Sequence, residues 1–234
     1  MSADDSFNGD AGLEGNAEKY SSVYSQIDFN SPLYGRTLYF LGSSVTRGYG
    51  ALGESLADFI SRRCGAEAVL SAVDGTTLAD LSPDSYASRV AGFDKGVRPD
   101  CFVCQLSTND VRVGDRGTVT SSFDVGGFDR KTTFGAVEYI AYYVKTVWDC
   151  PLLFYTNPYF DNPVYADMVG VLLKAAEKWG AFVLNLFSDR DFNAIPSEAR
   201  KLYMKDDIHP TKAGYRDWLA PEFEKILSRI VISR

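Results

Sequence analysis

The 234-residue sequence predicts an α/β protein, a three-layer α/β/α sandwich around a flavodoxin-like parallel sheet of five strands. Two observations predict this class. Apolar segments of strand length alternate with helix-like segments along most of the chain, which is the pattern of a doubly wound sheet. The apolar segments are almost continuously hydrophobic, which is typical of parallel strands covered on both faces.

Five segments have the length and hydrophobicity of such strands: 37–42, 68–73, 101–106, 152–157 and 182–187. The third contains Cys101 and Cys104, spaced as in a redox or zinc motif. Residues three apart in a strand face opposite sides, whereas a redox pair normally opens a helix. We therefore expect two separate buried thiols here.

Helices are predicted between and after these strands, at 53–65, 134–149, 162–180 and 212–230. The third has Pro163 in its first turn and Gly180 at its end, which are favoured positions for these residues. The last carries apolar side chains at helical spacing, Trp218 and Phe223 among them.

Two segments lie outside this pattern. Residues 1–32 are expected to form a partly ordered acidic arm before a single domain at 33–234, and the long polar loop 111–133 is expected to be functional or mobile.

Composition excludes several classes of protein. The net charge of −7 argues against binding of nucleic acid or of an anionic membrane surface. No apolar run reaches the roughly 20 residues that span a bilayer, and the first residues lack the features of a secretory signal. With four scattered cysteines, we expect a cytoplasmic protein with reduced thiols, whose oligomeric state the sequence leaves open.

Polar residues follow the predicted strands where ligands of parallel sheets bind. The motifs GSSVT (42–46), DGTT (74–77) and STND (107–110) come directly after the first three strands. Because the carboxyl ends of parallel strands lie at one edge of the sheet, these motifs are expected to converge there. The sole histidine, His209, precedes the last predicted helix and can join them.

These residues can supply the parts of a serine hydrolase. A serine nucleophile needs a base, and His209 is the only imidazole in the chain. Asp206, three residues earlier, can accept a hydrogen bond from the ring, whereas Asp207 is expected to point away. The N–H of the nucleophile, the N–H of Gly75 and the side-chain amide of Asn109 are candidate donors to the oxyanion.

The ordered motifs resemble the SGNH (GDSL-type) hydrolase family, over about residues 37–227. GSSVT is similar to the first family block and implies Ser44, rather than Ser43, as the nucleophile. VDGTT is similar to the second block, with Gly75, and STND to the third, with Asn109. DDIHP is similar to the last, with Asp206 and His209. The sequence departs from the family twice, because Ser43 replaces an aspartate and Ser107 replaces a glycine.

Several residues have two interpretations. Asp206, Asp207 and His209 could hold a metal, but they make a poor zinc set, and no metal is expected. Asn157 and Tyr159 could line the substrate cleft or serve packing. Arg112 could meet an anionic substrate or be a solvated loop residue.

The residues and the resemblance together predict an esterase or acylhydrolase with a Ser44–His209–Asp206 triad. The oxyanion hole is expected to comprise Ser44, Gly75 and Asn109. The expected partner is a small-molecule ester with a small acyl or acetyl group, such as an acetylated carbohydrate, and no cofactor is needed. An acyltransferase with the same residues and a binding module with a decayed site are the alternatives.

Overall fold

A computed structural model describes residues 10–233 of the chain, and its centre is a single parallel sheet. The strands are β1 (Thr37–Gly42), β2 (Glu67–Ala72), β3 (Cys101–Gln105), β4 (Leu152–Tyr155) and β5 (Phe182–Leu184). They are hydrogen-bonded in the order β2-β1-β3-β4-β5, and every pair is parallel. This is the predicted flavodoxin-like order, so the fold class is confirmed.

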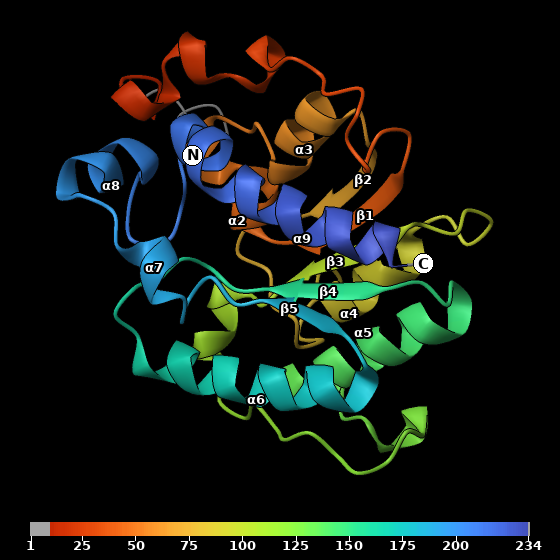
Figure 1. Cartoon of the computed structure of the whole chain (residues 1–234). Helices are drawn as coiled ribbons and strands as arrows, with labels where there is room; N and C mark the ends of the chain where they lie inside the picture. The colour runs from red at the N-terminus through yellow and green to blue at the C-terminus, as the bar shows by residue number, and fades with distance from the viewer. Residues whose placement is uncertain (1–9, 234) are drawn as a thin grey trace.

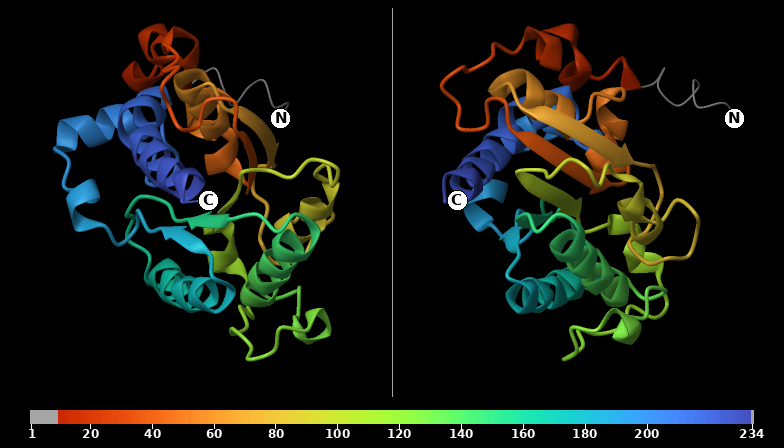
Figure 2. Two further views of the ribbon diagram at one scale, coloured as in Figure 1. Left: turned by 45° about the vertical axis from the view of Figure 1, so that its right-hand side comes forward. Right: turned by 90° about the vertical axis from the view of Figure 1, so that its right-hand side faces the viewer.

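Helices cover both faces of the sheet and complete the three layers (Figures 1 and 2). The helices α3 (Leu56–Cys64) and α9 (Ala220–Ile232) pack on one face, and α5 (Thr133–Val147) and α6 (Pro163–Trp179) pack on the other. None of the helices formed by residues 10–233 is both long enough and apolar enough to cross a bilayer.

The two cysteines of β3 enter different cores. Cys101 packs in the cluster with α3 and α9, and Cys104 packs in the cluster with α5 and α6. Neither cysteine forms a disulfide within the described residues, and burial raises the pKa of the Cys104 thiol. This confirms the prediction of separate, buried thiols.

The helix boundaries follow from local capping. Ser55 forms a reciprocal capping box with Asp58, so α3 begins at Leu56. Gly180 ends α6 in the left-handed conformation, which glycine adopts without strain. The predicted helix 212–230 is continuous, but its residues Gly214–Leu219 are π-helical and lead directly into α9. The ring of Pro221 would clash with the carbonyl four residues earlier in a regular helix, and the wider turn avoids this clash.

The prediction of strands covered on both faces is wrong for β2. Its residues Glu67, Val69 and Leu70 are exposed to solvent. The strand lies at the edge of the sheet, next to β1 only. A hydrophobic segment does not reveal which strand of a sheet is at the edge.

The described part of the predicted arm is folded against the domain. Residues 14–24 form three short 3₁₀ turns near the start of α3 and the segment before α9 (Figure 1). The buried side chain of Asn16 donates to the carbonyl of Gly50 (2.9 Å) and accepts from the N–H of Lys212 (3.0 Å). Asp10 forms an ion pair with Lys205 (2.6 Å).

Residues 113–132 are mostly irregular, with one 3₁₀ turn, and lie beside α5 and α6 (Figure 1). The buried carboxylate of Glu138 accepts from the N–H of Thr120 (2.8 Å) and pairs with Lys178. The loop is therefore anchored on the face of α5 and α6.

Candidate active site

The polar motifs converge on one cavity of about 370 Å³ beyond the carboxyl ends of the strands. Its lining residues come from four separate stretches of the chain: Ser44, Tyr49, Asp74, Gly75, Asn109, Arg112 and His209. Ser44 is largely buried, whereas Gly75 and Arg112 are exposed at the rim. The cavity therefore joins a buried hydroxyl to solvent.

The Ser44 turn (residues 42–47) begins where β1 ends. Gly42 closes the strand, and a Cβ atom there would lie 1.6 Å from Oγ1 of Thr46. Only glycine fits at this position, because the short helix α2 (Ser44–Arg47) folds back so tightly. Ser44 is the first residue of α2, and first-turn N–H groups have no partner within their helix. Its N–H can therefore donate to a ligand.

Gln105, the last residue of β3, fixes this turn from the interior of the protein. Its fully buried side-chain oxygen accepts from the N–H of Ser43 (3.0 Å) and from the hydroxyl of Thr46 (2.8 Å). The hydroxyl of Tyr86 donates to the same oxygen (3.2 Å). The Thr46 hydroxyl also contacts the hydroxyl of Tyr155 (2.6 Å). The Ser44 turn is thus fixed by buried polar groups on neighbouring strands.

The His209 loop (residues 204–211) approaches the turn from the other side. Nε2 of His209 lies 2.9 Å from Oγ of Ser44, and Nδ1 lies 2.8 Å from Oδ2 of Asp206. The other carboxylate oxygen of Asp206 accepts from the N–H groups of Ile208 and His209, each at 2.8 Å. The hydroxyl, imidazole and carboxylate therefore form one continuous hydrogen-bonded series.

The Asp206 carboxyl is held in its ionised form. Burial alone raises its pKa, but the hydrogen bonds from the His209 ring and from two backbone N–H groups outweigh this effect. Together they lower the pKa of Asp206 from 3.8 to about 2. A carboxylate facing Nδ1 keeps the proton on that nitrogen, which leaves Nε2 free to accept the proton of Ser44.

Tyr49 covers one side of the imidazole. The two ring centroids lie 4.9 Å apart, and the ammonium of Lys205 lies 4.1 Å from the centre of the Tyr49 ring. The next residue, Gly50, touches the His209 loop so closely that a Cβ atom would lie 2.5 Å from the carbonyl oxygen of Pro210. The segment after α2 therefore packs directly against the histidine.

The two remaining candidate donors line the same cavity. Gly75 has a φ of +74°, a conformation that strains other residues. Asn109 belongs to the 3₁₀ helix η6 (Thr108–Arg112), and its side-chain amide donates to the carbonyl of Thr76 (3.0 Å). The second N–H of that amide is directed at the Ser43 hydroxyl in a long contact of 3.4 Å, which an oxyanion beside Ser44 can replace. Both residues line the cavity together with Ser44.

The buried carboxylate of Asp110 connects the segment that carries Asn109 to the segment that follows Gly75. It accepts from the N–H groups of Leu78 (2.7 Å) and Ala79 (3.2 Å). The position of η6 relative to residues 74–79 is therefore fixed from inside the protein.

Both departures from the family pattern are buried and hydrogen-bonded. Ser107 caps η6, because its hydroxyl accepts from the N–H of Asn109 (3.1 Å) and donates to the carbonyl of Thr76 (3.1 Å). The hydroxyl of Ser43 lies 3.4 Å from the side-chain amide of Asn109. A serine at each position is thus compatible with the geometry around Ser44.

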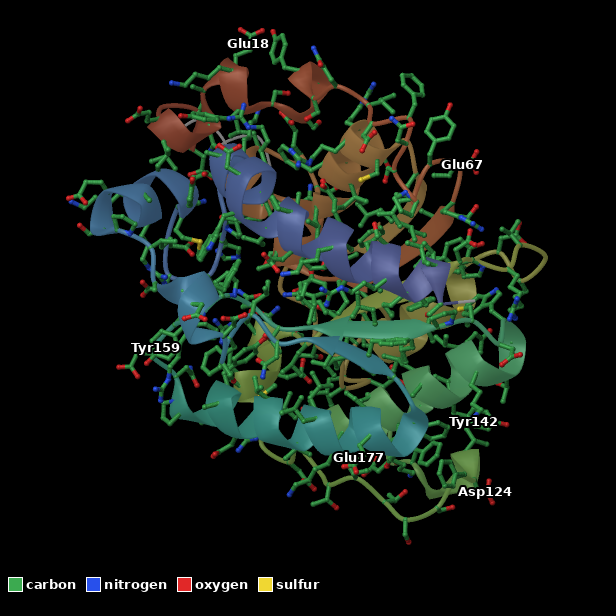
Figure 3. The ribbon with its side chains drawn as sticks, viewed as in Figure 1. Glu18, Glu67, Asp124, Tyr142, Tyr159 and Glu177 are labelled. Atoms are coloured by element: carbon green, nitrogen blue, oxygen red, sulfur yellow. The ribbon has the colours of Figure 1, made fainter. Side chains whose placement is uncertain are left out.

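Asn157 and Tyr159 do not line the cavity. Asn157 is completely buried, and its amide donates to the carbonyl of Ile208 (3.0 Å). Its side-chain oxygen lies 3.3 Å from Nε2 of Gln105. Tyr159 is half exposed and lies at the outer surface near α7 (Arg190–Asn193; Figure 3). Neither side chain therefore borders the cavity that contains Ser44.

Sequence reasoning missed the link formed by Gln105 and Asn157. This pair of buried amides joins the Ser44 turn to the His209 loop across β3 and the end of β4. A signal was present, because Gln105 is a polar residue within an otherwise apolar strand segment. Buried polar side chains in such positions are normally hydrogen-bonded to something specific.

Among residues 10–233, no cluster of three or more His, Cys, Asp or Glu side chains could hold a metal ion. Asp207, beside Asp206, is exposed.

Comparisons with known proteins agree with this architecture. Residues 40–216 match the model of the GDSL-like lipase/acylhydrolase family. A search of curated proteins finds no match. A solved structure from Lactobacillus plantarum superposes with a TM-score of 0.69 at 20% identity, covering 84% of this chain and 98% of that one. An acetylxylan esterase from Geobacillus stearothermophilus superposes with a TM-score of 0.57 at 17% identity, covering 83% and 94%.

At these identities the solved structures establish the shared fold alone. The family match is the stronger finding, because it covers most of the chain and includes all four motifs that line the cavity. The chain belongs to the GDSL-like lipase/acylhydrolase family, a family of hydrolases.

Proposed function

We propose that the protein hydrolyses carboxylic esters with small acyl groups through a Ser44–His209–Asp206 triad. The observation that carries the proposal is the pair of contacts made by the imidazole. Nε2 lies 2.9 Å from the Ser44 hydroxyl and Nδ1 lies 2.8 Å from the Asp206 carboxylate. This is the arrangement that a general base needs to activate a serine.

Each step then has a group to perform it. His209 takes the proton of Ser44 as Oγ attacks the ester carbonyl, and the N–H groups of Ser44, Gly75 and Asn109 stabilise the oxyanion. The protonated imidazole gives its proton to the departing alcohol, which leaves an acyl group on Ser44. Water, deprotonated by His209, attacks this acyl-enzyme, and the acid is released as Ser44 recovers its proton.

The shape of the cavity supports small acyl groups and water as the acceptor. None of its lining residues has an aliphatic side chain, so these residues form no apolar channel for a long acyl chain. Its rim is exposed at Gly75 and Arg112, whereas transfer to another acceptor requires that water be excluded. The acetylxylan esterase of similar fold makes acetyl esters the first substrates to test.

The replacement Ser44→Ala tests the proposal directly. We expect hydrolysis of p-nitrophenyl acetate to fall by at least about 10³-fold, and fluorophosphonate labelling to be lost, while circular dichroism is unchanged. Ser61→Ala, on α3, is the matched control and should keep full activity. Substantial turnover by Ser44→Ala, or labelling of another residue, would refute the triad.

A further inference from the structure

Arg112 is a positively charged residue of the cavity lining, and its side chain has no partner within residues 10–233. No hydrogen bond or ion pair of its guanidinium is present there, although the group lines the cavity with Ser44 and His209. Arg47, beside the cavity, is neutralised by its ion pair with Asp74. Lys205 is likewise paired with Asp10. The positive charge of Arg112 is therefore available to a ligand.

The backbone that carries Arg112 is fixed. Arg112 ends η6, which Ser107 caps and whose Asp110 is anchored on two buried N–H groups. Side chains three residues apart on a 3₁₀ helix lie on the same side, about 6 Å apart along the axis. Arg112 therefore projects on the same side of η6 as Asn109, one turn beyond the proposed oxyanion donor.

Each acidic group near the cavity has a partner other than Arg112, although Oδ1 of Asp74 accepts no hydrogen bond within the described residues. Asp74 is bound by Arg47, Asp206 by His209, and Asp110 by backbone N–H groups. A guanidinium that projects into such a site matches the planar, bidentate geometry of a carboxylate or phosphate. The net charge of −7 repels anions in general, so any preference for an anionic ester must arise locally.

The geometry points to an anionic substrate: we infer that Arg112 binds a carboxylate or phosphate group of the ester whose carbonyl lies beside Ser44 and Asn109. This inference rests on the proposed ester hydrolysis and names its substrate class. The anionic group can belong to the acyl part or to the alcohol part of the ester, since both parts adjoin the carbonyl held by Asn109.

Two pairs of esters that differ only in charge test the inference. For the acyl side, ethyl hydrogen succinate is compared with ethyl succinamate. For the alcohol side, 3-acetoxypropanoate is compared with 3-acetoxypropanamide. We expect kcat/KM to favour the anion by at least about tenfold in one pair, which also identifies the side that Arg112 contacts. Added salt should reduce the preference.

Three variants separate charge recognition from a general loss of activity. In Arg112→Gln the anion-to-amide ratio should fall close to one. In Arg112→Lys a part of the ratio should remain, because the charge is kept without the planar fork. Arg62→Gln removes an exposed arginine of α3, outside the cavity, and should keep the wild-type ratio.

The outcomes distinguish this inference from the proposed function. Equal turnover of anion and amide in both pairs, or an unchanged ratio in Arg112→Gln, overturns the inference and leaves ester hydrolysis intact. Absence of turnover of all four esters and of p-nitrophenyl acetate, together with no fluorophosphonate label on Ser44, overturns both.

Discussion

The turn that carries Ser44 is built into the interior of the molecule, whereas the loop that carries His209 lies largely at its surface. Buried groups of two neighbouring strands, Gln105 and Tyr155, hold the Ser44 turn. The His209 loop is held by its own turn at Asp206 and by single contacts from distant segments, such as the ion pair from Asp10 to Lys205. One of the two proposed catalytic partners thus belongs to the core, and the other is attached to it.

The two regions meet different requirements of a serine hydrolase site. A nucleophile must meet the oxyanion donors at fixed distances, and buried polar networks provide that rigidity. The histidine must exchange protons with water and alcohol, which an accessible loop permits. Gln105 and Asn157 connect the two regions, because their amides join the Ser43 N–H to the carbonyl of Ile208.

Asp206→Asn should have the largest effect in the His209 loop. Asparagine carries no negative charge, and its NH₂ group can donate to Nδ1 and so favour the wrong imidazole tautomer. We therefore expect kcat/KM to fall by about 10³- to 10⁴-fold. The neighbouring exposed residue provides the control, since Asp207→Asn should retain activity. A fall of less than about tenfold in Asp206→Asn would show that the carboxylate does not orient the base.

The lowered pKa of Asp206 also predicts how stability depends on pH. Because its pKa is lowered from 3.8 to about 2, its contribution to stability is complete above 3.8 and is lost as the pH falls through about 2. Urea midpoints should therefore decline over this window in the wild type and decline less in Asp206→Asn. Midpoints that stay unchanged between pH 3.8 and about 2 in the wild type would contradict an ionised, hydrogen-bonded Asp206 carboxylate.

Gln105→Met tests the buried side of the comparison. Methionine fills a similar volume but leaves the Ser43 N–H and the Tyr86 hydroxyl without their acceptor, at an expected cost of roughly 2 to 4 kcal/mol. Displacement of the Ser44 turn should lower kcat between about 10- and 100-fold, with a smaller change in KM. The exposed Gln26 supplies the control, Gln26→Met. Wild-type kcat in a folded Gln105→Met would exclude a positioning role.

Asp10→Asn should have the smallest effect. It removes one largely buried ion pair to the His209 loop but leaves a neutral amide in its place, so we expect a loss of about 1 to 2 kcal/mol and at most about a tenfold lower kcat/KM. The exposed Asp167→Asn, on α6, should change neither quantity. A loss as large as that of Gln105→Met would mean that the arm, rather than the loop itself, orients His209.

The sequence by itself determined the strand order and the residues that meet at the cavity. Each motif is a short continuous stretch directly after a strand, or just before the last helix, and parallel strands bring their carboxyl ends to one edge. Composition and local pattern are sufficient for such features. Gly180 marked the end of α6 for the same reason, whereas the predicted start at residue 53 lies three residues before Leu56, the first residue of α3.

Only the tertiary structure decided which surfaces are buried and what lies behind the site. The exposure of β2 depends on its place at the edge of the sheet, and the burial of Asn157 depends on a contact with Ile208, 51 residues away. The pair formed by Asp10 and Lys205 spans 195 residues. Interactions between groups so distant along the chain leave no local pattern, because they exist only once the intervening elements have packed.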